Sequence, residues 1–244
     1  MDLQGKVALV TGGAKRVGRT IALALASKGC HVGFSYNTSK SEAKDTLAEI
    51  RNLGVKADSV RGDISRPADI KKIVRDVETH LGPIDILINS ASIFERTPWP
   101  EIQEKTWDRH LTVNLKAPFL MAREVAPGMV RRGRGKIVNI VDWATERPYK
   151  HYLPYLVSKA GLVCLTKALA RELAPAVQVN GVAPGPVLLP EAMTDSERQA
   201  ILKATPLRRE GSPTDVANAV LFLVEGTDFA TGTILHVDGG RLIG

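Results

Sequence analysis

Three polar side chains in residues 141–159, "VDWATERPYKHYLPYLVSK", could together move a proton. Tyr155 and Lys159 lie four residues apart in a segment with helical patterning, so they share one helix face, and Asp142 follows a buried strand just upstream. An ammonium beside a phenol favours the phenolate, so we expect Lys159 to lower the pKa of Tyr155 toward the working range of an acid or base. The spacing alone also allows a solvent-facing Tyr155–Lys159 pair and an Asp142 that only caps the next turn.

A glycine-rich turn near the N-terminus provides a second functional pattern. In "VALVTGGAKRVGRTIALALA" (7–26), the turn lies between an apolar strand and a helix, and Gly12, Gly13 and Gly18 permit close approach of a ligand to the backbone. The free N–H groups and the positive dipole end of the helix would face an anion there. Glycines alone mark only a turn, but a strand, a glycine-rich turn and a helix in this order predict a phosphate site.

The segments that must position these residues alternate between strands and helices. Short apolar, β-branched runs predict strands at 7–10, 31–36, 57–62, 84–89, 136–141, 177–182 and 233–237. Between them, apolar residues recur at helical spacing in segments such as 19–29, 41–54 and 67–82. Alternating βαβ units with near-continuous apolar strands predict a single α/β domain over residues 1–244, a Rossmann-like, doubly wound parallel sheet of about seven strands with helices on both faces.

Residues 183–212, "APGPVLLPEAMTDSERQAILKATPLRREGS", interrupt this alternation with four prolines and one short amphipathic segment. Long connections in compact domains are commonly lids or binding loops. This connection follows the carboxyl end of a strand, where open α/β sheets bind ligands. We therefore expect a substrate lid here, with a plain surface excursion as the alternative.

Composition and charge narrow the function classes. No apolar run is long enough to span a bilayer and no secretory signal is visible, so we expect a cytoplasmic protein. Cys30 and Cys164 lack metal-ligand spacing; we expect two buried thiols in a reduced protein and no metal site. The net charge of +7 is spread along the chain except at 129–136, where Arg131 and Arg132 suit a helix C-terminus, so we expect no nucleic-acid partner.

These patterns resemble the short-chain dehydrogenase/reductase family. Thr11, Gly12 and Gly18 match its glycine-rich turn, and Asn114 stands where the family keeps an asparagine that supports the lysine through water. Segments 173–187 and 231–240 match two further stretches, so the resemblance covers essentially the whole chain. It implies a homotetramer that acts on a small molecule. It also implies that Tyr155 is the acid toward the substrate, while Lys159 tunes Tyr155 and holds the nicotinamide ribose.

The resemblance further implies a nicotinamide cofactor. NAD enzymes of this fold place an acidic residue after the second strand, whereas here Tyr36 takes that position. Hydroxyl and amide groups follow Tyr36, and Lys15, Arg16 and Lys40 can supply positive charge. These groups suit the 2′-phosphate of NADPH, so NADPH is favoured over NADH. "NSAS" (89–92) resembles the family's N-N-A-G turn, although Ser90 and Ser92 depart from it. The expected cofactor contacts are Gly12, Lys15, Arg16, Val17, Gly18, Ser35, Tyr36, Asn37, Thr38, Ser39, Asp63, Ile64, Asn89, Ala91, Tyr155, Lys159, Pro184 and Gly185.

Departures from the commoner family pattern point to a substrate. Most members carry a serine at the position of Asp142, and a carboxylate there would repel the alkoxide formed in ketone reduction. Asp142 suits a substrate that gains a proton on nitrogen, and pteridine reductases resemble this chain in carrying an aspartate there, an arginine at Arg16 and a pterin-stacking phenylalanine at Phe94. The expected catalytic residues are Asp142, Tyr155, Lys159 and Asn114. The expected substrate wall is Phe94, Asp142, Trp143, Tyr155, Leu188, Leu189 and the neighbouring Pro190.

The sequence thus predicts an NADPH-dependent reductase of a pterin, such as dihydrobiopterin or dihydromonapterin. One alternative is a carbonyl reductase on the same scaffold, acting on 3-oxoacyl thioesters, sugars or steroids. A second alternative is a non-catalytic NADPH-binding sensor or scaffold, which the intact Asn114, Tyr155 and Lys159 set disfavours. Which pterin is natural, and whether folates fit, stays open at this point.

Overall fold

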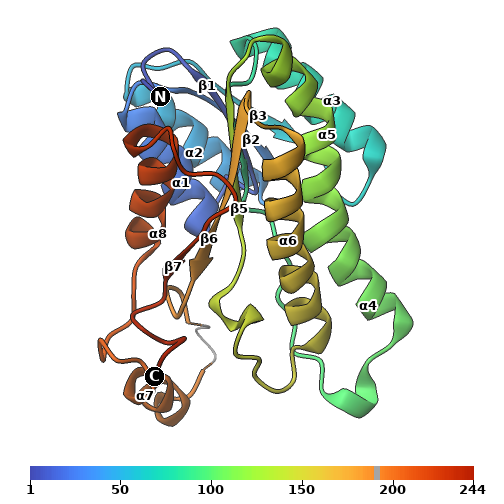
Figure 1. Ribbon diagram of the computed structural model, residues 1–244, viewed down its shortest axis with the longest axis vertical. Coiled ribbons are helices and arrows are strands. Elements are labelled where there is room, and N and C mark those ends of the chain that lie inside the picture. Colours follow the sequence, from blue (N-terminus) through green and yellow to red (C-terminus); the bar gives the residue numbers. More distant parts are fainter. Residues whose placement is uncertain (190–192) are drawn as a thin grey trace.

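The computed structural model describes residues 1–189 and 193–244. These residues form one parallel sheet in the strand order β3-β2-β1-β4-β5-β6-β7, so the chain winds outward in both directions from the β1–β4 pair (Figure 1). The predicted doubly wound α/β domain is confirmed. The strands are β1 (Val7–Thr11), β2 (His31–Tyr36), β3 (Ala57–Arg61), β4 (Ile86–Asn89), β5 (Gly135–Ile140), β6 (Val177–Pro184) and β7 (Ile234–Val237).

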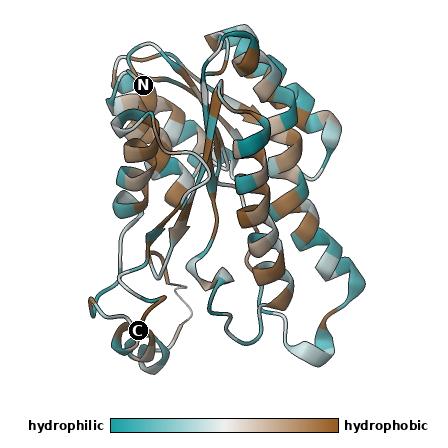
Figure 2. Cartoon of the chain, in the orientation of Figure 1, coloured by the Kyte–Doolittle hydropathy of each residue, from teal (hydrophilic) through white to brown (hydrophobic). Residues whose placement is uncertain are grey.

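The sheet is buried on both faces because its central strands are apolar on both sides. In β1, Ala8 and Val10 join the apolar cluster on one face, while Val7 and Leu9 join the cluster on the other. Figure 2 shows hydrophobic colour along the central strands and alternating colours on the surrounding helices. Burial on both faces fixes the register of the strands, and therefore the level at which each strand ends.

Helices cover both faces, and short helical turns complete the chain. The first face carries α1 (Arg16–Ser27), α2 (Lys40–Asn52) and α8 (Pro213–Leu221); the second carries α3 (Pro67–Leu81), α5 (Ala117–Arg131) and α6 (Leu153–Glu172), with α4 (Glu104–Leu111) against α6 (Figure 1). The short turns are η1 (Trp99–Glu101), the π-helical η2 (Thr112–Lys116), η3 (Trp143–Thr145) and the π-helical η4 (Phe222–Gly226).

Two local expectations need correction. The first helix begins at Arg16 rather than at residue 19, because its first turn is polar and shows no apolar periodicity. Cys164 lies on the exposed side of α6, whereas Cys30 is buried as expected; both thiols are free. Among the described residues, α6 is also the helix long and apolar enough to cross a membrane, but it packs against α4 and β6, which accounts for its apolar character.

The described residues of the connection between β6 and α8, 185–189 and 193–212, follow the carboxyl end of β6. Strand β6 runs on to Pro184, and the connection then forms α7 (Asp195–Lys203), whose first turn is fixed by a capping box between Thr194 and Glu197. The C-terminal residues lie beside α7, as Figure 1 shows. Pro190, which follows Leu189 in this connection, was expected in the substrate wall and lies outside the described residues.

Candidate active site

A cavity of about 1190 Å³ opens at the carboxyl ends of the strands, where the winding of the sheet reverses. Its wall is built from the segments after β1, β2, β3, β4, β5 and β6, so residues far apart in the sequence face one space. A pocket for one small ligand is commonly about 300–1,000 Å³. This cavity is thus large enough for a dinucleotide together with a substrate.

The glycine-rich turn after β1 forms one end of the cavity. Gly12 has φ +66°, and a Cβ at Gly18 would lie 2.3 Å from the carbonyl oxygen of Gly12, so only glycine fits at Gly18. Thr11 Oγ1 accepts hydrogen bonds from the N–H groups of Ser90 and Ala91 at 3.0 and 3.1 Å. These bonds fix the β1 and β4 turns to each other, and helix α1 then begins with its N-terminus facing the cavity.

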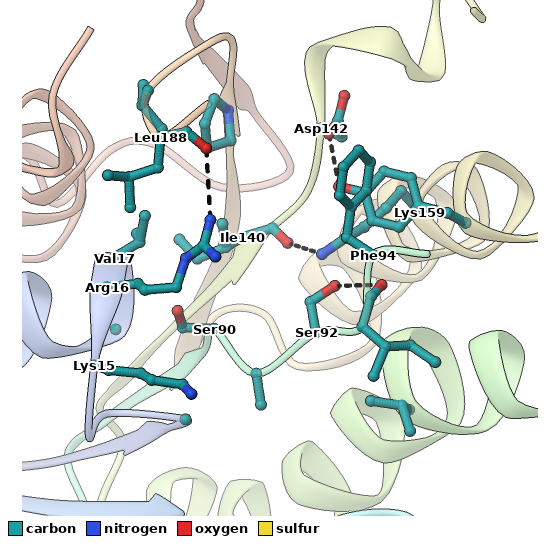
Figure 3. Close-up of a pocket in the computed structure, with 18 of the residues that line it drawn as sticks. Lys15, Arg16, Val17, Ser90, Ser92, Phe94, Ile140, Asp142, Lys159 and Leu188 are labelled. Atoms are coloured by element: carbon teal, nitrogen blue, oxygen red, sulfur yellow. Dashed lines mark hydrogen bonds between the residues drawn. The ribbon is translucent and has the colours of Figure 1, made fainter. Parts of the chain in front are cut away.

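Arg16 connects the glycine-rich turn to the segment after β6 that was expected to form a lid. Its backbone has φ 53°, a conformation uncommon for a residue with a side chain. From there the guanidinium crosses the cavity and Nη2 donates to the carbonyl oxygen of Leu188 at 3.5 Å (Figure 3). Lys15 lies on the same wall and forms an exposed 3.9 Å ion pair with Glu42, an arrangement that contributes little to stability.

The end of β2 forms the next part of the wall. Ser35 is buried and its hydroxyl accepts from the N–H of Gly12 at 3.4 Å, so it supports the glycine-rich turn. The lining at this end and after β3 includes Tyr36, Asn37, Thr38, Ser39, Asp63 and Ile64. Hydroxyl and amide donors with cations nearby suit an anionic group. Lys40 is not among the described residues that line the cavity.

Two of the expected site residues do not lie on the cavity wall. Asn89 is buried in the sheet, where Nδ2 donates to Asn139 Oδ1 at 2.8 Å and so links β4 and β5; its contact with the cofactor stays a prediction. Asn114 is buried in the π-helical turn η2; its Oδ1 accepts from Ser92 Oγ and Ile93 N, and its Nδ2 donates to Ile93 O and Ser158 Oγ. The polar atoms of this side chain are thus all bonded within the fold, and the expected support of Lys159 through water stays a prediction.

The chemical centre lies at the other end of the cavity, between η3 and α6. The Tyr155 hydroxyl donates to Asp142 Oδ2 at 2.6 Å. The other carboxylate oxygen, Oδ1, accepts from the Ala144 N–H at 2.8 Å and caps η3. One oxygen of Asp142 thus caps the turn, as the alternative interpretation expected, while the other binds Tyr155; the catalytic role of Asp142 stays a prediction.

The pKa shifts at this centre differ from the sequence-based expectation. Burial and the negative charge of Asp142 hold the pKa of Tyr155 well above its usual value, so the expected lowering by Lys159 is wrong for the protein without ligands. Burial also raises the pKa of Asp142, although its bonds from Tyr155 and Ala144 and the charge of Lys159 oppose the shift. The Tyr155–Asp142 pair thus favours keeping a proton, as a proton donor requires.

Lys159 lies on the same face of α6 but does not bind Tyr155 directly. Its Nζ donates to the carbonyl oxygen of Ile140 at 2.7 Å and lies 5.8 Å from the centroid of the Tyr155 ring (Figure 3). Burial lowers the pKa of Lys159 to about 8, and the nearby charge of Asp142 acts in the opposite direction. The amine is thus held at the cavity wall by the end of β5.

Aromatic rings form the wall beside Tyr155. The ring of Phe94 is stacked on Tyr152, with centroids 4.4 Å apart and planes 9° apart, and meets Tyr155 edge-on at 4.7 Å. Phe94 remains 48% exposed, so part of its ring is open to a ligand. Trp143, Leu188 and Leu189 also line the cavity, and they remain predicted substrate contacts.

The sequence interpretation missed other lining residues. They are Ala14, Gly62, Ser65, Ser90, Ser92, Ile93, Arg109, Val113, Ile140, Val141, Tyr149, Tyr152, Pro186, Val187, Met193, Ile201 and Arg241. The two tyrosines in "ERPYKHY" (146–152), close to the expected catalytic helix, were the available signal. No group of three or more potential metal-ligating side chains is found within residues 1–189 and 193–244.

Comparison with known proteins supports a reductase. A family described as enoyl-(acyl carrier protein) reductase matches residues 12–241. A 3-oxoacyl-(acyl-carrier-protein) reductase of Staphylococcus epidermidis is 35% identical, covering 96% of this chain and 98% of that protein. A 2-dehydro-3-deoxy-D-gluconate 5-dehydrogenase of Formosa agariphila is 33% identical, covering 99% and 94%. An actinorhodin polyketide ketoreductase crystallised with NADPH superposes with a TM-score of 0.92 at 32% identity, covering 98% of both chains.

Proposed function

This chain belongs to the short-chain dehydrogenase/reductase family of oxidoreductases, and on that premise we propose that it is an NADPH-dependent reductase of pterins. The observation that carries the proposal is the 2.6 Å hydrogen bond from Tyr155 to the Asp142 carboxylate, at a position where ketone chemistry favours a neutral hydroxyl donor. A carboxylate accepts hydrogen bonds from the N–H and amino groups of a pterin ring. It would repel an alkoxide.

The residues at the centre divide the work of reducing a C=N bond. NADPH, when bound, supplies the hydride for the carbon, and the nitrogen needs one proton from the protein. Tyr155 holds that proton in its hydrogen bond to Asp142, and the raised pKa of Asp142 lets the pair be reprotonated from water. Lys159, anchored on Ile140, would hold the nicotinamide ribose of the bound cofactor.

The remaining wall fits both parts of the ternary complex. Gly12, Gly18 and the start of α1 would hold the phosphates, with Arg16 and Lys15 as cations, and the lack of an acid after β2 favours the 2′-phosphate of NADPH. The polyketide ketoreductase with NADPH is similar to this chain over its whole length. The open part of the Phe94 ring would stack on the pterin, and the segment around Leu188 and α7 would act as a lid over it.

A second candidate function is a carbonyl reductase acting on 3-oxoacyl thioesters. The curated relatives support it, since a 3-oxoacyl-(acyl-carrier-protein) reductase is 35% identical over nearly the full length of both chains. Asp142 is the feature that argues against it.

The deciding experiment follows NADPH oxidation with dihydrobiopterin, dihydromonapterin, dihydrofolate and a 3-oxoacyl thioester, using the wild-type protein and Asp142→Ser. Under the pterin proposal, the wild type reduces at least one pterin and the variant loses about 100-fold or more in kcat/KM, since a general acid is commonly worth 10²–10⁴. Turnover of the thioester alone, maintained or increased in Asp142→Ser, would establish the second candidate instead.

We also infer a homotetramer and a cytoplasmic location. Phe119 on α5 and Leu153 and Val157 on α6 are exposed apolar side chains of the kind that subunit contacts cover. The free thiols of Cys30 and Cys164 agree with a reducing compartment. Light scattering on the purified protein measures the subunit number, and a monomer mass would contradict the assembly.

A further inference from the structure

Arg241, three residues before Gly244, lies on the wall of the cavity that holds Asp142 and Tyr155. Its guanidinium carbon is 5.3 Å from the centroid of the Trp143 ring, and Trp143 directly follows Asp142. A guanidinium over an aromatic face is held in place by cation–π attraction and leaves its N–H edges free for another partner. Arg241 therefore presents a cation to the space in which the substrate would lie.

The backbone that carries Arg241 is fixed by a tight turn. The Asp238 carboxylate accepts from the N–H groups of Gly240 and Leu242 at 2.9 and 2.8 Å, and the Arg241 N–H donates to the Asp238 carbonyl oxygen at 3.2 Å. Gly239 and Gly240 have φ +64° and +82°, which the turn requires. This turn packs on the end of β6, because a Cβ on Gly185 would lie only 2.6 Å from Asp238 Cα.

Within residues 1–189 and 193–244, Arg241 has no carboxylate within ion-pair distance. The nearby acids are engaged elsewhere: Asp238 binds the turn, Asp142 binds Tyr155 and Ala144, and Glu146 lies 3.4 Å from His236. A second cation is close instead, because Arg147 Nη1 donates to the Arg241 carbonyl oxygen at 3.4 Å. Burial and this neighbouring charge both lower the pKa of Arg241.

We propose that Arg241, reinforced by Arg147, forms a subsite for a carboxylate or phosphate group carried on the substrate's side chain. Arg241 is partly buried on the cavity wall, whereas Arg147 is exposed beside it and lies outside the cavity lining. The two like charges repel each other, and an anion bound to Arg241 relieves that repulsion. The forked guanidinium matches the paired oxygens of either group. The ring identity in this inference rests on the proposed pterin function, whereas the anion preference rests on Arg241 alone.

The first experiment measures binding to the NADP⁺-loaded protein by calorimetry. The carboxylate pair is folate and pterin-6-methanol, and the phosphate arm is the phosphate ester of pterin-6-methanol. We expect the wild type to bind one anionic ligand about tenfold or more tightly than pterin-6-methanol, as charge-assisted hydrogen bonds predict. Whichever ligand, folate or the phosphate ester, has the larger affinity ratio to pterin-6-methanol shows whether the subsite prefers a carboxylate or a phosphate. Arg241→Met should reduce the ratio to about one, and Arg241→Lys should keep part of it.

Ring-free anions give a readout that needs no pterin binding. Glutarate and inorganic phosphate, titrated at constant ionic strength, should change the fluorescence of Trp143 saturably in the wild type and not in Arg241→Met. Trp143→Phe assigns the signal, since Trp99 and Trp107 also fluoresce. Arg75→Met is the matched control, because Arg75 is an exposed arginine on α3 that binds Asp76 far from the cavity lining.

The two proposals fail in different ways. A saturable, Arg241-dependent response to ring-free anions without any pterin binding supports the subsite and overturns the pterin assignment. Pterin binding with a ratio near one in the wild type, or a ratio unchanged in Arg241→Met, overturns the subsite and leaves the pterin function in place. If Arg241→Met has an altered melting temperature, the affinity ratio of Arg147→Met is measured in its place. A ratio that stays at the wild-type value in both Arg147→Met and Arg241→Lys also overturns the subsite.

Discussion

The Tyr155 hydroxyl and the Asp142 carboxylate are joined by a 2.6 Å hydrogen bond, and the second oxygen of that carboxylate caps the η3 turn. The cap fixes the orientation of the carboxylate before any ligand binds. The Tyr155 hydroxyl therefore donates to a carboxylate whose position is set by the backbone N–H of Ala144. A change at Asp142 should consequently affect both proton delivery and the fold.

Asp142→Asn should lower activity and raise stability. Burial raises the pKa of Asp142 in the folded state, so the ionised carboxylate opposes folding. The stability that Asp142 contributes while it is protonated is lost as the pH rises through its folded-state pKa. The neutral amide keeps an oxygen for the Ala144 cap but cannot share a proton with Tyr155. We expect kcat to fall about 100-fold, with the melting temperature rising by about 2–4 °C at neutral pH, equivalent to about 1 kcal/mol.

The pH dependence of this stability gain provides the check. Thermal unfolding of wild type and Asp142→Asn should give similar melting temperatures near pH 4, and a difference that grows toward pH 7. A difference that is constant with pH would mean that the carboxylate is not disfavoured by burial. Asp45→Asn, an exposed change on α2, is the control.

Lys159→Met should show the opposite pH trend. The pKa of Lys159 is lowered to about 8 by burial, so the charged amine opposes folding. The stability that Lys159 contributes while it is neutral is present at high pH and is lost as the pH falls through about 8. The variant also loses the hydrogen bond to Ile140, so we expect a net gain of only about 1 kcal/mol near pH 7. Melting curves should show this gain shrinking between about pH 8 and pH 10.5; a gain that increases with pH would contradict the burial argument.

The sheet and most helices were predictable because their signals are local. A continuous apolar run predicts β2 at its observed bounds, and an amphipathic repeat predicts α3 to within one residue. Glycine spacing and the Tyr155–Lys159 step are local patterns too, which is why the two ends of the cavity could be inferred. The first turn of α1 was missed because it is polar and helps to bound the cavity.

The contacts that hold the other site residues join distant segments, and no local pattern encodes these contacts. Asn114 binds Ile93, 21 residues away, and Ser158, 44 residues away. Arg241 reaches Trp143 across the fold, and Phe94 stacks on a tyrosine from another loop. The expected effect of Lys159 on Tyr155 failed for the same reason, because the bond to Ile140 and the burial of Tyr155 arise only in three dimensions.

Asn114→Ala should loosen the substrate wall from the catalytic helix. Asn114 ties Ser92 and Ile93, just before Phe94, to Ser158 beside Lys159, and the change leaves several of these buried groups unpaired. We expect a loss of about 3 kcal/mol in the free energy of unfolding, measured by urea titration, and a higher KM for the substrate. Asn52→Ala, exposed at the end of α2, should change stability by less than about 0.5 kcal/mol. Equal effects of the two changes would exclude the positioning role.

Arg16→Gly separates the backbone cost of Arg16 from its side-chain role. At φ 53° a glycine relieves strain of about 1–2 kcal/mol, but it also adds about 0.5–1 kcal/mol of entropy to the unfolded chain, so we expect little net change in stability. The side chain, in contrast, forms the bond to Leu188, and under the proposed function it would also supply a cation near the cofactor phosphates.

Without that side chain, NADPH should bind about tenfold or more weakly in a fluorescence titration, as expected for the loss of a charge-assisted contact. The lid should also be cleaved faster by protease near Leu188 in the absence of cofactor, because its tether to the glycine-rich turn is gone. Arg16→Lys is the matched control, since it keeps the charge and the backbone strain but not the forked guanidinium. If Arg16→Gly binds NADPH as tightly as the wild type, the guanidinium serves the lid alone, and the cofactor phosphates depend on Lys15 and the backbone of the turn.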